Sequence, residues 1–314
     1  MTWLITGAGG FLGSHLAEAL AADGIEVHGT VRTPPSRGTT NAGAAVAHHE
    51  CDIRDAAQVS AVISAVHPTT ICHLAAQSSP TESWIDATET FNTNAGGLVR
   101  VLDAVRSTVP DSLVLAVGSS AEYGPSSGPI AEDHPQVPGT PYGVSKVAQD
   151  LIAALYHAHY GMRTVRLRPF FVVGPRKMGD VTSDLAKRVV AVEDGTTDTV
   201  TVGNLDAIRD LLDVRDAVAA FRMIAAQAAA GSVYNVCSGV GHPVRAVLDG
   251  MIALSSVPIA VRDDPALLRP GDESIRVGDS GRLRALGWSP LVGFERMVGD
   301  VLDYWRREAE IARS

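Results

Sequence analysis

TGAGGFLG, residues 6–13, follows a short apolar run and opens an amphipathic segment that extends to residue 22. Its glycines have the spacing GxxGxxG. The first permits a tight turn, the second lets a diphosphate approach the backbone, and the third lets the helix pack on the strand. A helix that begins here presents free N–H groups and a positive dipole end to an anion. The stretch predicts a dinucleotide-binding βαβ unit, with cofactor contacts at Gly7, Gly10, Phe11, Leu12 and Gly13.

Short apolar runs alternate with longer amphipathic segments through the first half of the chain. The runs predict strands at 3–6, 26–31, 45–50, 70–74, 113–117 and 164–168. The amphipathic segments predict helices at 11–22, 55–66, 87–107 and 142–160. Alternation at this spacing is typical of a parallel sheet with helices on both faces. We therefore expect an α/β fold of the Rossmann type, with a doubly wound sheet.

The pattern loosens after residue 169. It predicts helices at 181–193, 214–230, 243–255 and 294–309, and strands at 199–203 and 232–236. We expect strand 232–236 to return to the main sheet. The predicted organisation is a dinucleotide-binding domain (1–170, with return elements near 211–238), a smaller substrate-binding lobe (171–210 and 239–290) and a C-terminal helix (291–314).

Composition excludes several classes of protein. Of 314 residues, 46% are hydrophobic and 19% are charged, which is ordinary for a globular protein. A net charge of −9, without a run of Lys or Arg longer than a pair, argues against nucleic acid and anionic membranes as partners. No apolar stretch is long enough for a membrane span or signal peptide, so a soluble, cytoplasmic protein is expected.

The cysteines and histidines predict neither disulfides nor a metal site. Three scattered cysteines suit a reducing compartment, and none has a His or Cys neighbour at metal-ligand spacing. His48, His49, His67 and His73 do not form a metal constellation, and His73 is expected in the core.

The end of the second predicted strand indicates which dinucleotide binds. NAD-binding proteins usually place an acid there for the ribose 2′-hydroxyl, whereas a guanidinium suits a 2′-phosphate. Arg32 stands at this end, and no acid follows until Glu50. Arg32 therefore favours NADP(H), with NAD(H) as the alternative if Arg32 is only a solvated surface residue.

YxxxK at Tyr142–Lys146 predicts the catalytic pair. On a helix, these positions share a face, so phenol and ammonium lie side by side. We expect the ammonium, with a nicotinamide cation when oxidised cofactor is bound, to lower the phenol pKa toward a value useful for general acid–base catalysis. Lys146 can also reach the nicotinamide ribose, and Ser119, one step past strand 113–117, adds a second donor to a carbonyl. The alternative for YxxxK alone is an exposed helix pair.

Four stretches together resemble the extended short-chain dehydrogenase/reductase family of nucleotide-sugar modifiers: TGAGGFLG, HLAAQSS (73–79), GSSAEYG (118–124) and PYGVSK (141–146). Three stretches in the second half, at 202–218, 231–239 and 267–288, resemble its GDP-mannose 4,6-dehydratase and GDP-6-deoxy-D-mannose reductase branch. This resemblance implies an NADP(H)-binding domain and a lobe that holds a nucleoside-diphosphate sugar, preferably a GDP-sugar. It also implies cofactor contacts at Asp52, Ile53, Leu74, Ala75 and Ala76, although Asp52 could equally be a turn residue.

The resemblance further implies a set of substrate residues. Arg209 and Arg269 match positions that hold the nucleotide phosphates and ribose, with two surface salt bridges as the alternative. Phe171 stands where the family usually has an Asn that helps to hold the substrate diphosphate. Arg176 and Lys177 could replace that contact with charge, with a solvated surface pair as the alternative. The sugar is expected at Ser78, Ser79, Glu82 and Ser120. For Ser78, Ser79 and Glu82 the alternative is a turn and helix cap ahead of Trp84.

Ala121 restricts the reaction. Dehydratases of the family carry a Glu two residues before Tyr-Gly, and Ala121 stands at that position. Glu122 is one residue off and, on an extended segment, would point to the other face. Reduction of a 4-keto sugar needs only Ser119, Tyr142 and Lys146, so the sequence favours an NADPH-dependent reductase. A 4-epimerase, a 4,6-dehydratase and a non-enzymatic redox sensor remain as alternatives. Helices 87–107 and 142–160, which often pair subunits in this family, suggest a homodimer.

Overall fold

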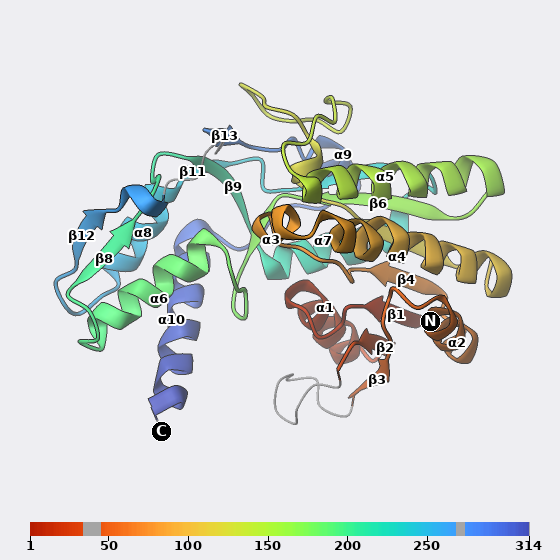
Figure 1. Cartoon of the computed structure of the whole chain (residues 1–314), viewed down its shortest axis with the longest axis horizontal. Helices are drawn as coiled ribbons and strands as arrows, with labels where there is room; N and C mark the ends of the chain where they lie inside the picture. Colours follow the sequence, from red (N-terminus) through yellow and green to blue (C-terminus); the bar gives the residue numbers. More distant parts are fainter. Residues whose placement is uncertain (34–44, 268–273, 314) are drawn as a thin grey trace.

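A parallel sheet of seven strands lies at the centre of the computed structural model, which describes residues 1–33, 45–267 and 274–313 (Figure 1). The predicted Rossmann-type α/β fold is confirmed. Strand β1 (Thr2–Thr6) lies inside the sheet, and the strands that follow it in the chain are added on both of its sides. Strand 232–236 returns to this sheet as predicted. In spatial order the strands are β10 (Val233–Val236), β6 (Thr164–Pro169), β5 (Leu113–Val117), β4 (Thr70–His73), β1 (Thr2–Thr6), β2 (Glu26–Val31) and β3 (Val46–Glu50).

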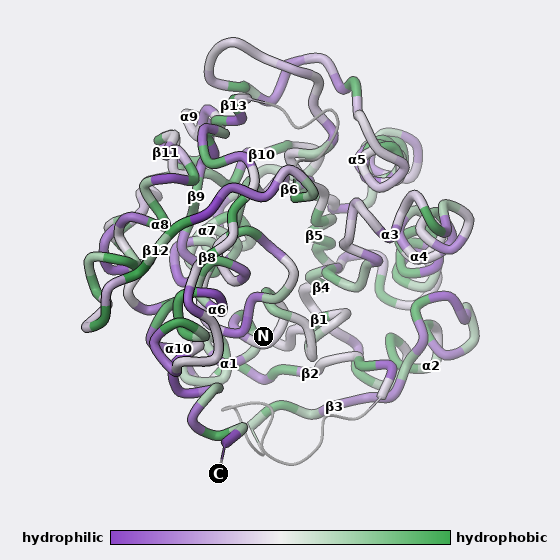
Figure 2. The backbone as a smooth tube through the Cα atoms, turned by 60° about the vertical axis from the view of Figure 1, so that its left-hand side comes forward, coloured by the Kyte–Doolittle hydropathy of each residue, from purple (hydrophilic) through white to green (hydrophobic). Residues whose placement is uncertain are grey.

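Helices cover both faces of the sheet. Successive strand residues point to opposite faces, so Ile5 and Leu115 pack under α1 (Phe11–Ala22) and α7 (Val214–Gln227). Leu4 and Val114 pack under α2 (Ala56–Val66), α4 (Ala87–Thr108) and α5 (Pro141–Tyr160). Both layers are built from helices that alternate between hydrophobic and hydrophilic residues along their length (Figure 2).

The ends of α5 are well defined. Thr140 caps its N-terminus by accepting the Gly143 N–H, and Pro141 occupies its first turn. Gly161 ends the helix with φ +68°, in the left-handed region that glycine enters without strain. These signals fix the register of the helix that carries Tyr142 and Lys146.

A second hydrophobic core lies beside the sheet. Its main elements are α6 (Val181–Glu193), β8 (Thr199–Val202), β9 (Ile208–Asp213), α8 (Val244–Ala253) and α10 (Phe294–Arg313). Strand β9 pairs with β7 (Phe171–Val173), β11 (Gly241–Pro243) and β13 (Ile275–Arg276), and β12 (Ala260–Asp263) pairs with β8. Short elements complete the chain: α3 (Pro80–Ile85), α9 (Gly281–Ala285) and two 3₁₀ helices, η2 (Ser120–Glu122) and η3 (Pro265–Leu267).

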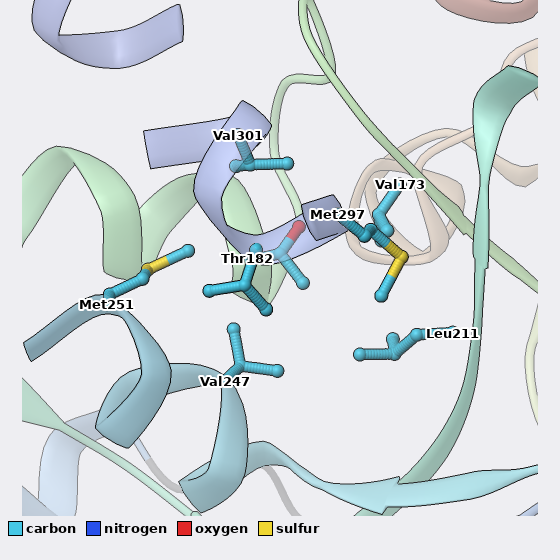
Figure 3. A pocket seen from close by; sticks show the side chains of 8 residues that line it. Val173, Thr182, Leu211, Val247, Met251, Met297 and Val301 are labelled. Carbon is cyan, nitrogen blue, oxygen red and sulfur yellow. The ribbon is translucent and has the colours of Figure 1, made fainter. Parts of the chain in front are cut away.

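This second core contains a small apolar cavity of about 10 Å³ (Figure 3). That is roughly the space of one water molecule, and an apolar cavity of this size stays dry. The cavity is a packing defect rather than a ligand site. Its lining residues are Val173, Thr182, Leu211, Val247, Met251, Met297, Val298 and Val301.

Some predicted boundaries differ from the structure. Helix α7 ends at Gln227 instead of 230, because Gly231 turns the chain with φ +84° and donates its N–H to Thr164. Strands β7, β9, β11, β12 and β13 and helix α3 were not predicted. The lobe boundaries near 170, 210, 238 and 290 remain a prediction. Within the described residues, no helix combines the length and apolarity that crossing a bilayer requires.

Candidate active site

The glycine loop between β1 and α1 has the geometry of an anion cradle. Gly7 has φ +72°, and a Cβ at Gly13 would lie 2.3 Å from the Gly7 carbonyl oxygen. Gly10 is the N-cap of α1 and brings no side chain to its free N–H groups. The first and third glycines therefore do what the sequence predicts, and the uncapped helix end suits a dinucleotide diphosphate.

The end of β4 lies directly beside this loop. The Thr6 hydroxyl accepts the N–H groups of Leu74 and Ala75, each at 3.1 Å. A Cβ at Gly7 would lie 2.9 Å from the Ala75 backbone, so no larger residue fits between the two strand ends. The structure thus brings the predicted contacts Leu74, Ala75 and Ala76 next to the glycine loop.

A charged cluster follows β2 and β3, where the adenosine end is expected. Arg54 donates to the Asp52 carboxylate from Nε at 2.9 Å and also pairs with Glu89. The hydrogen bond with Arg54 is the main cause that lowers the pKa of Asp52 to about 2, and Arg32 adds a smaller electrostatic contribution. The Asp52 carboxylate is thus committed to Arg54, as a turn residue would be. Ile53 is buried against α4, and Arg32 is exposed.

Ser119, Tyr142 and Lys146 are brought together as predicted. Lys146 Nζ donates to the carbonyl of Val117, at the end of β5, at 3.0 Å. The Ser119 hydroxyl accepts the Ala121 N–H and forms a hydrogen bond with the Tyr142 phenol. All three surround the point where β5 ends and α5 begins.

The expected lowering of the Tyr142 pKa is wrong for the chain by itself. Burial raises the pKa of Tyr142 to about 12, and the hydrogen bond with Ser119 opposes this only in part. Burial also lowers the pKa of Lys146 to about 8. Because the ammonium is itself desolvated and bonded to Val117, it does little to favour a phenolate. Tyr142 is therefore a neutral phenol over the physiological pH range.

The segment after Ser119 is a 3₁₀ helix, so the expectation of extended backbone at Glu122 is wrong. The Glu122 side chain is fully buried and closes a capping box by accepting the Ser119 N–H at 2.8 Å. Its other oxygen accepts from Gln136 at 2.9 Å and pairs with Arg168 at 3.1 Å. Glu122 is thus committed to holding the loop, and Ala121 leaves its own position without an acid.

Arg168 lies at the centre of a buried charge network. It binds Asp150 through Nε at 3.0 Å and Nη2 at 2.8 Å, in addition to Glu122. Its Nη1 donates to the Tyr123 hydroxyl at 2.8 Å and to the Glu132 carbonyl at 2.9 Å. One guanidinium therefore joins β6 to α5 and to the loop that carries Ser119.

The second lobe approaches this loop through Arg276, which sequence reasoning missed. Arg276 is buried on β13 and donates to the carbonyls of Ser120 and Tyr123. It lies opposite Arg209 of β9, whose guanidinium stacks 5.3 Å from the centre of the Phe171 ring. Phe171 thus packs against Arg209 in place of the amide that the family usually has. Arg269 lies outside the described residues.

Two residues predicted to contact substrate have structural contacts in this chain, and their role in substrate binding stays a prediction. Arg176 forms a bidentate ion pair with Glu18 of α1, at 2.5 and 2.9 Å, which occupies the guanidinium fork that a diphosphate would need. Ser79 is the N-cap of α3 and accepts the Glu82 N–H at 3.1 Å, which is the cap alternative stated above. Ser78 and Glu82 are exposed, and Ser120 is buried beneath Arg276.

Histidine and cysteine side chains serve the core. His73 is buried at the end of β4, its Nδ1 bonds the Thr6 hydroxyl at 2.9 Å, and burial lowers its pKa to about 3. All three cysteines are buried and free. In the part of the chain that the structure describes, no group of three or more His, Cys, Asp or Glu side chains could hold a metal ion.

The chain is similar in sequence to known proteins over most of its length. The family model for GDP-mannose 4,6 dehydratase matches residues 4–301. A GDP-6-deoxy-D-mannose reductase of Pseudomonas aeruginosa is 27% identical over 307 residues, with 96% of each chain covered. GDP-mannose 4,6 dehydratase 2 of Arabidopsis thaliana is 31% identical, with 96% of this chain and 85% of that protein covered.

Solved structures give the same picture. The structure of RMD from Pseudomonas aeruginosa, complexed with NADPH, has a TM-score of 0.85 and 26% identity, over 98% of this chain and 99% of that one. The Thermus thermophilus UDP-glucose 4-epimerase, in complex with NAD, has a TM-score of 0.87 and 29% identity over the same shares. The relatives thus include a reductase, a dehydratase and an epimerase, with two different nicotinamide cofactors.

Proposed function

This chain belongs to the GDP-mannose 4,6-dehydratase family of nucleotide-sugar enzymes, and we propose that it is an NADPH-dependent 4-keto reductase. Its substrate would be a nucleoside-diphosphate 4-keto-6-deoxyhexose. GDP-4-keto-6-deoxy-D-mannose is the preferred candidate, with GDP-D-rhamnose as product. The GDP base and the product rest on the resemblance to the GDP-6-deoxy-D-mannose reductase named above. The observation that supports reduction is the cluster of Ser119, Tyr142 and Lys146 at the end of β5, with Ala121 in place of the acid that dehydration needs.

The residues of the site have distinct tasks in this proposal. A bound NADPH supplies the hydride that reaches C4 of the sugar. Ser119 donates its hydroxyl hydrogen to the ketone oxygen, because its own oxygen already accepts the Ala121 N–H. Tyr142 then gives its phenolic proton to the same oxygen, which completes the alcohol. Lys146, anchored on Val117, directs its remaining N–H groups toward the nicotinamide ribose.

The protonation state of Tyr142 suits the proton-donating step of a reduction. A reductase needs a proton donor, and a phenol with a pKa of about 12 is protonated at neutral pH. An epimerase uses the same Ser119, Tyr142 and Lys146, so net oxidation of the cofactor is the property that separates it from a reductase. A dehydratase needs a further acid, and Ala121 cannot supply one.

The preference for NADP(H) rests on Arg32. The exposed guanidinium stands at the end of β2, beside the Arg54–Asp52 pair, where a ribose 2′-phosphate would lie. The Asp52 carboxylate near Arg32 is paired with Arg54, which reduces its repulsion of a second anion. NAD(H) is the alternative.

Cofactor consumption tests the reaction. Purified enzyme given GDP-4-keto-6-deoxy-D-mannose is expected to oxidise NADPH stoichiometrically with the sugar reduced, and to prefer NADPH over NADH. Conversion of a UDP- or GDP-hexose into its 4-epimer without net cofactor oxidation would establish the epimerase instead. Formation of a 4-keto-6-deoxy sugar from GDP-mannose would establish the dehydratase.

A homodimer through α4 and α5 is also proposed. The outer faces of α3, α4 and α5 expose an apolar patch made of Trp84, Ile85, Phe91, Val144, Leu151, Leu155 and Tyr160. Exposed large apolar side chains gathered on neighbouring helices support an interface here. Light scattering at micromolar concentration is expected to give twice the mass of the chain, and Leu151→Asp with Leu155→Asp is expected to halve it. A wild-type mass equal to one chain would contradict this proposal.

A further inference from the structure

The segment 174–177, between β7 and α6, lies along one side of α1. Gly174 stands opposite Phe11, whose ring lies 3.8 Å from the position of a Gly174 Cβ. The Pro175 carbonyl accepts a hydrogen bond from His15 at 3.0 Å. With the ion pair of Arg176, this segment contacts α1 at residues 11, 15 and 18, which share one face of the helix. The contacts fix 174–177 against the helix that begins at the glycine loop.

The backbone of this segment is unusual at Arg176. Its φ is +72°, a left-handed conformation that an arginine adopts only against steric cost. Such conformations persist where surrounding contacts hold them, often at binding sites. Here the bidentate ion pair with Glu18 holds the strained residue. The reversal at Arg176 directs the following residue back to the first turn of α1.

That residue is Lys177, whose ammonium lies 4.9 Å from the centre of the Phe11 ring. Phe11 is the first residue of α1, so the ammonium lies beside the positive end of the helix dipole. Among the described residues, Nζ has no hydrogen-bond acceptor or ion pair, and Asp180 acts on it only as a nearby charge. Burial lowers the pKa of Lys177. Two positive groups therefore face one another without an anion between them.

We propose that Lys177 binds the diphosphate of the bound dinucleotide from beside Phe11, at the first turn of α1. This inference rests on the proposed function, because it assumes that the glycine loop binds a nicotinamide dinucleotide. An ammonium here forms a charge-assisted hydrogen bond to a phosphate oxygen that NAD(H) and NADP(H) share. Lys177 thus contributes affinity, whereas Arg32 contributes the preference for a 2′-phosphate.

Binding measurements separate these two roles. Lys177→Gln is expected to weaken NADPH and NADH alike, by about 10- to 100-fold, the usual effect of losing a hydrogen bond to a charged group. Adenosine 2′-monophosphate, which lacks the diphosphate, should bind this variant as it binds the wild type. Arg32→Ala should instead weaken NADPH more than NADH. All affinities are measured by calorimetry at one ionic strength.

Lys187 provides a matched control. It is also a lysine over an aromatic ring, 4.2 Å from the centre of Trp305, but on α6. Lys187→Gln should change neither affinity more than twofold. Equal affinity of wild type and Lys177→Gln for both dinucleotides would overturn the inference and leave the proposed function standing. Failure of the wild type to bind either dinucleotide would overturn the proposed function, and the inference with it.

A second measurement uses the wild type and needs no folded variant. The chain has only three lysines, at 146, 177 and 187. With NADPH bound, acylation of Lys177 by an amine reagent should slow at least tenfold, while acylation of Lys187 should not change. Mass spectrometry of the digested protein measures each rate. An unchanged rate at Lys177 under saturating NADPH would overturn the inference.

Discussion

Replacement of Tyr142 by Phe is expected to lower kcat for NADPH oxidation by about 10²- to 10⁴-fold, the usual contribution of a positioned general acid. The change removes one hydroxyl from a buried side chain and keeps its ring. Without that hydroxyl, the ketone oxygen must take its proton from water as hydride arrives at C4. Ser119 can still polarise the carbonyl, so the variant should bind substrate and cofactor nearly as well as the wild type.

Stopped-flow measurement of NADPH oxidation checks this effect in a single turnover, which separates chemistry from product release. Urea unfolding and NADPH affinity serve as controls for folding and cofactor binding. Ser119→Ala provides the comparison, because it removes a hydrogen bond to the ketone but no proton donor. A Tyr142→Phe variant that retains more than one tenth of the wild-type rate would show that Tyr142 is not the proton donor.

The central sheet could be predicted because its strands are nearly continuous apolar runs, each followed by an amphipathic helix. Strand β5, LVLAV, is buried at every position, and no other secondary structure suits so short a run between turns. Strand β13 has only two residues and forms by pairing with β9, some sixty positions earlier in the chain. A run of two residues is too short to show the apolar pattern by which the longer strands could be predicted.

Some residues of the candidate site could likewise be predicted from the sequence, and others could not. Tyr142 and Lys146 could be predicted because their spacing on one helix sets their geometry. The roles of Arg276 and Lys177 could not, because each depends on where a distant segment packs. Glu122 was misplaced for a related reason. An extended backbone was assumed after β5, whereas the capping box between Ser119 and Glu122 turns that segment into a 3₁₀ helix.

Replacement of Arg168 by Met is expected to lower the free energy of unfolding by about 3–5 kcal/mol at pH 7.5, the usual cost of removing one partner from a buried ion pair. Arg168 is 3% exposed, and its loss leaves the Asp150 carboxylate buried without its nearest cation and Glu122 without one of its hydrogen-bond donors. The Met side chain fills most of the volume of Arg168 but carries no positive charge and donates no hydrogen bond to either carboxyl group. Arg166→Met is the matched control on the same strand, since Arg166 also donates to Asp150 but is partly exposed. The Arg166→Met variant should lose far less of the free energy of unfolding than Arg168→Met.

The dependence on pH distinguishes lost charge pairing from lost packing. Burial, together with repulsion from Asp150, raises the pKa of Glu122 from 4.5 to about 8 even with Arg168 in place. The folded state therefore holds this proton more tightly than the unfolded state, and stability should fall as pH rises from about 4.5 to about 8. Without Arg168 the folded-state pKa rises further, so the variant goes on losing stability above pH 8, where the wild type levels off. Adding Glu122→Gln should remove much of this slope. Urea unfolding between pH 5 and pH 9.5 measures it, and an equal loss of stability in Arg168→Met at pH 6 and at pH 9.5 would show that the guanidinium acts only by filling space.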